Sequence, residues 1–345
     1  MKPLDWIVLL GTLLFIVGYG VWKTRGSKNI ESYLLGDKKM RWWTIGLSIM
    51  ATQASAITFL SGPGQAYDDG MRFVQFYFGL PVAMVILSVT LVPFYHKLNV
   101  YTAYEFLEKR FNVVLRVFTA FLFLTQRGLA AGFTIFAPSL ILSILLGWNI
   151  YLTNLLIGAL VIFYTVSGGT KAVAQTQKQQ MGVILLGMVI AGVLVVKMMP
   201  ENVGITEALH IAGKTGKLNV VDFNFDLSSR YNVWSGLIGG LFLFLSYFGT
   251  DQSQVQRYLS GASIGQSRLG LLFNGIVKIP MQFFILLIGA LVYVFYIFQA
   301  PPLFFNSVSE QKTLESEYAD EYRILQEEYI ATHQLKKESA FSLLE

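Results

Sequence analysis

The sequence predicts an all-α polytopic membrane protein, and three observations support this fold class. Hydrophobic residues make up 54% of the 345 residues, and charged residues only 14%. The mean hydropathy is +0.54, which is well above that of a soluble domain of ordinary composition. The apolar residues gather in long runs, and about 20 such residues are enough to cross a bilayer as a helix.

About eight runs are long enough to be membrane spans. The first run is followed by basic residues without a small-residue cleavage site, so we interpret it as a retained helix and not as a signal peptide. The expected transmembrane helices cover residues 4–22, 42–61, 73–96, 114–146, 148–167, 179–199, 232–251 and 271–298.

The basic residues indicate the orientation of these spans. Most of the Lys and Arg outside the spans lie in every second loop, beginning with the loop after the first span. Loops rich in Lys and Arg face the cytoplasm. The sequence therefore predicts a multi-pass protein of the cell (inner) membrane, with the N-terminus and the C-terminal tail outside. The expected cytoplasmic loops are 23–41, 97–113, 168–178 and 252–270.

The chain divides into a transmembrane domain, 1–305, and a charged helical tail or loop, 306–345. Within the first part, the external loop 200–232 is expected to cap the bundle. In the tail, residues spaced by three and four form an apolar stripe on one helix face. We expect this helix to pack on the external face, rather than to bind a partner as a coiled coil. The stripe consists of Tyr318, Tyr322, Leu325 and Tyr329.

Composition also excludes several kinds of chemistry. The absence of cysteine excludes disulfides and Cys-ligated metal sites. His96, His210 and His333 lie far apart, so we interpret them as solvated and not as metal ligands. The net charge of +5 is explained by the orientation of the helices, so we expect no binding of nucleic acid. No span carries the clustered His, Asp or Glu that a membrane enzyme would need.

The second span contains a polar interruption. Small and hydroxyl-bearing residues occupy 51–56 and Thr58, where a lipid-facing helix would carry Leu or Phe. Unpaired backbone is tolerated at membrane depth only where it lines a protein-enclosed cavity, so this stretch indicates an ion or substrate site. The alternative is ordinary helix packing through small residues.

Three polar side chains lie within other spans. Arg127 is near the middle of the fourth span, where a charge is costly, so we expect it to face a cavity and to meet an anion or carbonyl groups. Lys278 lies near the start of the last span and either belongs to a site or snorkels to the interface. Gln75 either makes hydrogen bonds in a site or meets water near the external surface.

Three further segments carry alternative interpretations. The pair Gly168–Gly169 predicts a helix stop and turn after the fifth span. The polar stretch 175–180 is either a cytoplasmic exit path or a solvated helix start. The aromatic pair Tyr247–Phe248, followed by Asp251, belongs either to a ligand pocket or to the interfacial aromatic belt.

Four motifs, in this order and spacing, resemble the sodium/solute symporter family along nearly the whole chain. They are SIMATQASAITFLSGPGQAY in the second span, LNVYTAYEFLEKRFN after the third, YTVSGGTKAV after the fifth and TDQSQVQRYLSG after the seventh. The resemblance implies a five-plus-five inverted repeat with one extra N-terminal helix. It also implies a discontinuous first core helix at the polar interruption, and movement of sodium with an organic solute by alternating access.

The resemblance also implies roles for individual residues. Ala51 and Ala54 are similar to positions whose backbone carbonyls coordinate the main sodium ion, the expected coupling ion. Arg127 matches a position where sialic-acid transporters of the family carry an arginine near the substrate carboxylate. The expected substrate contacts are Ser55, Thr58, Gln75, Arg127, Tyr247 and Lys278.

The chain departs from the family pattern in two ways. Gln177 stands where many members have an aspartate that supports a second sodium in some relatives, which favours a single coupling ion or altered coupling. The family pattern also continues through further spans, including a helix whose serine hydroxyls complete the main sodium site. We therefore expect this chain to be a fragment, a truncated reading frame or half of a split protein.

The expected function is sodium-coupled symport of a small organic solute, either a carboxylate-bearing sugar or a monocarboxylate. The alternative is a truncated, non-transporting membrane protein or a solute sensor. The protein is not expected to be an enzyme, and its expected partners are the small-molecule substrate, sodium and the lipid bilayer.

Overall fold

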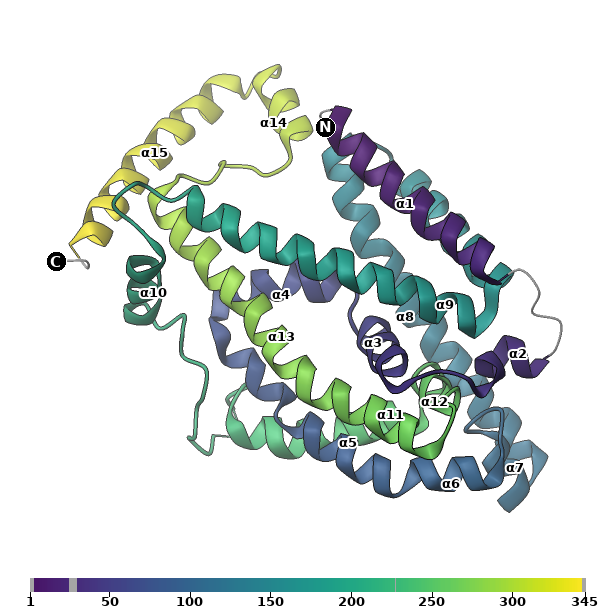
Figure 1. Cartoon of the computed structure of the whole chain (residues 1–345). Coiled ribbons are helices and arrows are strands. Elements are labelled where there is room, and N and C mark those ends of the chain that lie inside the picture. Colours follow the sequence, from purple (N-terminus) through teal and green to yellow (C-terminus); the bar gives the residue numbers. More distant parts are fainter. Residues whose placement is uncertain (1–2, 25–29, 227, 343–345) are drawn as a thin grey trace.

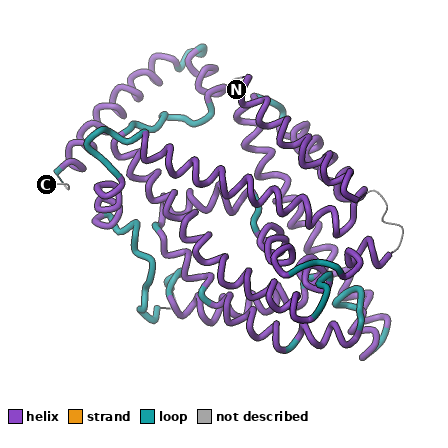
Figure 2. Tube along the Cα trace, viewed as in Figure 1, coloured by secondary structure: helices purple, strands orange, loops and turns teal. Residues whose placement is uncertain are grey.

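The computed structural model describes residues 3–24, 30–226 and 228–342, which form helices joined by loops (Figure 2). Within these ranges no β-strand is formed, and the one isolated bridge joins Met40 and Gly261. The all-α prediction is therefore confirmed. The elements are α1 (Pro3–Thr24), α2 (Ile30–Leu35), η1 (Gly36–Lys38), α3 (Trp42–Gln53), α4 (Ala56–Asp69), η2 (Met71–Tyr77), α5 (Gly79–Val89), α6 (Leu91–Leu98), α7 (Glu105–Arg110), α8 (Val113–Leu146), α9 (Ile150–Lys197), α10 (Ile205–Lys214), η3 (Ser235–Gly239), α11 (Gly240–Thr250), α12 (Gln252–Leu259), α13 (Ile264–Phe298), α14 (Ser307–Leu314) and α15 (Ala319–Phe341).

Several helical stretches are long and apolar enough to cross a membrane. In the described chain there are 4, namely Met71–Leu98, Val113–Leu146, Val173–Lys197 and Ile264–Phe298. A fifth crossing results when α3 and α4, which are bent by 61° at their break, are counted as one span. Shorter apolar helices coincide with the other expected spans. The multi-pass membrane class is confirmed, whereas the count of eight and the inverted repeat stay predictions.

The loop expected at 168–178 is wrong, because α9 remains helical over all 48 residues from Ile150 to Lys197. A straight helix of that length would measure about 72 Å, more than twice the ~30 Å of hydrocarbon in a bilayer. Figure 1 shows its ribbon bending between an arm beside α1 and a long arm that passes α3 and α13, and all three helices contact α9. A Ser-Gly-Gly sequence at 167–169 is typical of a kink that bends a helix without ending it.

The helix α13 lies at the centre of the bundle, where it contacts α3, α4, α5 and α9 (Figure 1). It begins at Ile264, earlier than the expected 271, because the Ser263 hydroxyl accepts a hydrogen bond from the Gln266 N–H at 3.3 Å and caps the first turn. A helix that is apolar on all sides is typical of a buried position. By contrast, α8 exposes large apolar side chains such as Val114 and Phe133, as expected for a surface in contact with lipid.

The tail is helical and packs against the end of α13. His333 is buried, with Nε2 3.0 Å from the carbonyl oxygen of Tyr296, so its interpretation as solvated is wrong. The buried residues of α15 are His333 and Ala340, which lie two turns apart on one face. Of the expected stripe, Tyr318 and Leu325 are exposed, whereas Tyr322 and Tyr329 are half-buried and Tyr329 lies beside His333. The expected stripe therefore forms only part of the packing face. The division into 1–305 and 306–345 stays a prediction.

Candidate functional site

The expected interruption of the second span is present. The helix α3 ends at Gln53, Ala54 and Ser55 are extended, and α4 begins at Ala56. At the start of α4, the Thr58 hydroxyl accepts a hydrogen bond from the Ser55 N–H at 3.3 Å. A serine followed three residues later by a side chain that bonds back to its amide is a helix-start signal, which explains why the helix restarts here.

The break leaves backbone carbonyl groups without helical partners. The Ala54 N–H still donates to the Met50 carbonyl at 2.8 Å, but the chain then leaves the helix. The carbonyls of the last turn of α3, beginning with Ala51, therefore receive no amide from a following turn. Ala51 and Ala54 are both half-buried. Carbonyl oxygens at an unwound point inside a membrane helix are suitable ligands for a hard cation such as Na⁺.

Gln177 ties α9 to α3 just before the break. Its Oε1 accepts a hydrogen bond from Ser48 Oγ at 2.8 Å, and its Nε2 donates to Thr52 Oγ1 at 3.1 Å. Both ends of the amide are thus engaged within the protein. An engaged and uncharged amide is a weaker cation ligand than a carboxylate, so these contacts are structural.

A cavity lined by both polar and apolar side chains lies beside the start of α4. Its volume is about 270 Å³, just below the usual range of about 300–1,000 Å³ for ligand sites. Thr58 of α4 and Gln282 of α13 both line the cavity. Gln282 is buried, and its Oε1 has no hydrogen-bond partner in the described chain. The lining residues are Ile57, Thr58, Ser61, Gly62, Gln65, Phe73, Tyr77 and Gln282.

Lys278 lies one turn before Gln282 on α13. Its side chain has 0% exposure, which rules out the snorkelling interpretation. Within the described residues the Nζ atom has no hydrogen-bond partner, and it lies 5.8 Å from the centre of the Tyr77 ring. Because Tyr77 lines the cavity beside Thr58, the amine lies close to that cavity wall.

Arg127 on α8 meets an anion, as expected, but the anion belongs to the protein. Its guanidinium pairs with the carboxylate of Asp251, and its central carbon lies 5.5 Å from the centre of the Tyr247 ring. Asp251 also caps α12, because its Oδ1 accepts hydrogen bonds from the N–H and the hydroxyl of Ser253 at 2.9 and 2.6 Å. The charge of Arg127 is therefore balanced within the described fold.

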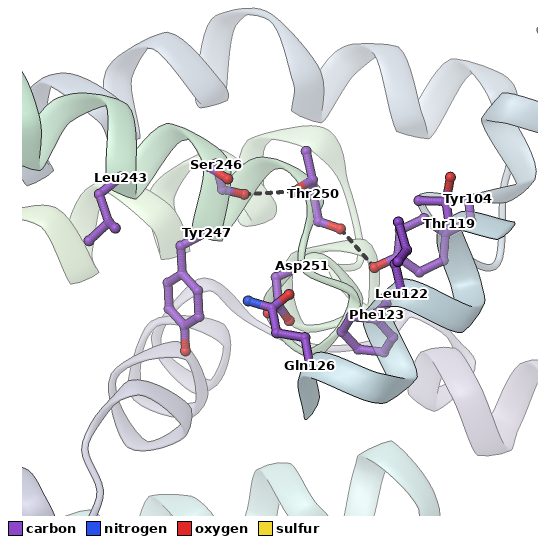
Figure 3. A pocket seen from close by; sticks show the side chains of 10 residues that line it. All are labelled: Tyr104, Thr119, Leu122, Phe123, Gln126, Leu243, Ser246, Tyr247, Thr250 and Asp251. Atoms are coloured by element: carbon purple, nitrogen blue, oxygen red, sulfur yellow. Dashed lines mark hydrogen bonds between the residues drawn. The ribbon is translucent and has the colours of Figure 1, made fainter. Parts of the chain in front are cut away.

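The Arg127 pair borders a second cavity, of about 310 Å³, between α8 and α11 (Figure 3). The Tyr104 hydroxyl lies at one side and donates to the Thr250 carbonyl at 3.1 Å. Burial raises the pKa of Tyr104 to about 12, so this hydroxyl stays protonated and remains a donor. The lining residues are Tyr104, Thr119, Leu122, Phe123, Gln126, Leu243, Ser246, Tyr247, Thr250 and Asp251.

Gln75 is fully buried in η2, but its amide holds the external loop. Its Oε1 accepts a hydrogen bond from the Asp222 N–H at 2.8 Å, and its Nε2 donates to the Tyr231 carbonyl at 3.3 Å. The interpretation of Gln75 as a group that meets water is therefore wrong. Both ends of its amide are used by backbone groups of the loop, and its role as a substrate contact stays a prediction.

The structure thus divides the expected site residues into groups. Thr58 lines the first cavity and Tyr247 lines the second. Lys278 lies behind the first cavity, next to Tyr77, and Arg127 lies beside the second, paired with Asp251. Gln75 lies under the external loop. The sequence analysis missed Tyr77 and Gln282. Gln282 could have been found from its spacing, because it lies four residues after Lys278 and therefore on the same face of the helix.

Comparisons with known proteins identify the family of this chain. The model of the sodium:solute symporter family matches residues 33–325. The chain is 32% identical over 311 residues to the human sodium/iodide cotransporter, covering 88% of this chain and 47% of the relative. It is 33% identical over 273 residues to human sodium-coupled monocarboxylate transporter 1, covering 78% of this chain and 44% of the relative.

A solved structure of a Na⁺-coupled sialic acid symporter, in a substrate-bound outward-open state, is also similar. The TM-score is 0.79 at 26% identity, and the match covers 87% of this chain and 64% of the other. The chain spans about half the length of the curated relatives it matches. Because the family model matches most of the sequence, the chain belongs to the sodium:solute symporter family.

Proposed function

We propose that this protein acts in sodium-coupled symport of a small organic solute across the inner membrane, and not as an enzyme. The observation that carries the proposal is the break between α3 and α4, which leaves carbonyl groups free of helical partners near a cavity at the start of α4. In the proposed orientation the N-terminus and the tail 306–345 lie outside, and residues 1–305 form the transmembrane part.

Sodium is the proposed coupling ion. Bound to the carbonyls of Ala51 and Ala54, it would fix the backbone at the break and so order Ser55 and Thr58, which follow directly. An ion that binds one arrangement of the break better than the others raises the population of that arrangement, and solute and ion then raise each other's affinity. The engaged amide of Gln177 favours a single coupling ion.

The proposed solute is an organic anion, either a carboxylate-bearing sugar or a monocarboxylate. The similar proteins are described as transporters of iodide, of monocarboxylates and of sialic acid, all of which are anionic. The expected contacts are Ser55, Thr58, Gln75, Arg127, Tyr247 and Lys278.

The test uses the purified 345-residue chain in lipid nanodiscs and in proteoliposomes. Binding of radiolabelled sialic acid, glucose and lactate is measured in NaCl and in choline chloride, and uptake is measured with an inward sodium gradient. We expect sodium-dependent binding and uptake of an anionic solute. Sodium-dependent binding without uptake would instead favour a solute sensor, and no effect of sodium on either measurement would overturn the proposal.

Replacing Thr58 by Val is expected to weaken solute binding about fivefold, the effect of losing one hydrogen bond of about 1 kcal/mol. The control is Thr134→Val on α8, which removes a hydroxyl that is exposed and bonds to its own helix, at the Ala130 carbonyl. Equal affinities for the two variants would remove Thr58 from the site. The Thr58 hydroxyl also caps α4. Measuring the unfolding temperatures of both variants therefore distinguishes a lost solute contact from destabilisation of this helix start.

A further inference from the structure

We propose that the external loop between α10 and η3 binds the headgroup of a phosphatidylethanolamine from the adjoining leaflet, and that Asp226, Phe225 and Trp234 hold its ammonium group. The inference concerns the lipid and goes beyond the proposed function. Its test requires no assumption about the solute or the coupling ion.

A third cavity, of about 300 Å³, lies where this loop meets η3 and α11 (Figure 1). Phe225 and Asp226 line it from the loop, and Trp234, Ser235 and Ile238 line it from the start of the expected span 232–251. It shares no lining residue with the two cavities described above. The cavity therefore lies between a polar loop and an apolar span, the level at which lipid headgroups meet a membrane protein.

Exposed aromatic side chains surround this cavity. Phe223 is 74% exposed and Phe225 71% exposed, which is unfavourable in water and favourable at the surface of a bilayer. Trp234, Ile238 and Phe242 are also exposed and follow one another at intervals of four, so they share one side of the adjoining helical turns. The apolar surface of the span thus continues into the loop, which indicates that lipid covers both.

Asp226 places a negative charge beside these rings. Its pKa is lowered by hydrogen bonds from the Ser228 hydroxyl and N–H, at 2.7 and 2.8 Å, so the carboxylate is ionised at neutral pH. Among the described residues it has no ion-pair partner. The guanidinium of Arg230 lies 5.3 Å from the centre of the Tyr231 ring instead. A carboxylate without a cation is complementary to an ammonium group.

The rings and the carboxylate are held in place before a ligand binds. The Phe225 and Trp234 rings meet edge to face, with centres 6.1 Å apart and an angle of 75° between their planes. The Trp234 Nε1–H donates to the Phe223 carbonyl at 3.1 Å, and the Asn232 amide donates to the Asp226 carbonyl at 2.8 Å. Aromatic faces attract ammonium groups, tryptophan most strongly, and a preorganised site loses less entropy on binding.

The carboxylate favours a primary ammonium group. An ionised carboxylate has about four acceptor positions, so Asp226 can accept an N–H from the ligand in addition to its hydrogen bonds within the loop. Ethanolamine headgroups carry three such N–H groups, choline headgroups carry the charge without them, and glycerol headgroups carry neither. With the headgroup in the cavity, the acyl chains can lie along Ile238 and Phe242, which are exposed.

The test compares three lipids with identical dilauroyl chains: phosphatidylethanolamine, phosphatidylcholine and phosphatidylglycerol. Binding to the purified 345-residue chain in detergent is measured by native mass spectrometry. We expect phosphatidylethanolamine to bind about fivefold more tightly than phosphatidylglycerol and about threefold more tightly than phosphatidylcholine, as an exposed ammonium contact requires. Equal affinities for the three lipids would overturn the proposal.

Matched variants locate the site. Asp226→Asn keeps an acceptor for Ser228 but removes the charge, and Phe225→Leu keeps an apolar side chain but removes the ring; both should lose most of the preference for phosphatidylethanolamine. The controls are Asp320→Asn on α15 and Phe305→Leu after α13, which change exposed residues outside the cavity and should keep it. An unchanged preference in Asp226→Asn would remove the ammonium from this loop.

Two other occupants are distinguished in the same experiment. Displacement of the lipid by an equal concentration of free ethanolamine would show a site for soluble amines and overturn the lipid assignment. A dimer that dissociates in Phe225→Leu would show instead that a second copy covers the aromatic side chains, with the same consequence.

The position of the loop is measured separately. Because the chain has no cysteine, Phe223→Cys accepts a single environment-sensitive fluorophore. In nanodiscs its emission should shift to the blue and be quenched by brominated lipid, whereas a label at Leu335→Cys, an exposed position on α15, should show neither effect. Water-like emission from both labels would contradict contact between the loop and the bilayer.

Discussion

Replacing Arg127 by Gln is expected to lower the free energy of unfolding by about 3 kcal/mol, because the change leaves the carboxylate of Asp251 buried without its cation. Asp251 is 8% exposed and Arg127 31% exposed at their side chains. The hydrogen bonds from Ser253 still satisfy one carboxylate oxygen, which places the loss at the lower end for a broken buried pair. Unfolding followed by tryptophan fluorescence of the purified protein measures it.

The matched control lies on the same helix. Arg116 pairs with Glu108, but the two side chains are 41% and 39% exposed, so Arg116→Gln should cost no more than about 1 kcal/mol. The double variant Arg127→Gln/Asp251→Asn should recover most of the loss, because it removes both charges and leaves neutral amides. Equal losses for Arg116→Gln and Arg127→Gln, or no recovery in the double variant, would contradict the assignment of a buried pair.

The same double variant also tests the substrate role that the resemblance implies for Arg127. The comparison uses lactate and its uncharged amide, lactamide. If Arg127 holds the solute carboxylate, the double variant loses the preference for lactate over lactamide. If Lys278 holds it, the preference persists. The measurement therefore separates two cations whose positions in the sequence look alike, since both lie inside apolar helices.

The sequence predicts the features of the site that depend on neighbours along the chain. The break between α3 and α4 follows from small and hydroxyl residues at 51–56, which weaken a helix locally and also cap the next one. The partial burial of Arg127 and the presence of an anion beside it follow from the cost of a charge in a membrane helix.

The partners of these residues could not be predicted, because they come from distant parts of the chain. Asp251 is 124 positions from Arg127, and Gln75 is held by loop residues 147 and 156 positions away. Only the packing of α8, α11 and the external loop brings them together. The prediction of a loop at 168–178 was wrong for a different reason, because glycines can bend a helix as well as end it.

The contact between α13 and α4 could not be predicted from the sequence either. Disturbing this contact is expected to cause a large loss of stability. A Cβ atom at Gly289 would lie 2.1 Å from the carbonyl oxygen of Pro63 and 2.7 Å from its Cα. Both are backbone atoms, so no side chain can move aside and the two helices must separate. Small residues at such crossings allow close packing of membrane helices.

We therefore expect Gly289→Ala to lower stability by about 2–3 kcal/mol, as overpacking of a tight contact does, although alanine favours a helix by about 1 kcal/mol over glycine. Gly132→Ala on α8 is the control, because a methyl group added at Gly132 would have no described atom of a neighbouring element within 4 Å; it should be neutral or stabilising. Thr58 and Gln282 line the first cavity from α4 and α13, so separating these helices should also weaken lactate binding. If Gly289→Ala matched Gly132→Ala in both stability and lactate affinity, the close approach of α4 and α13 would not be what positions the cavity.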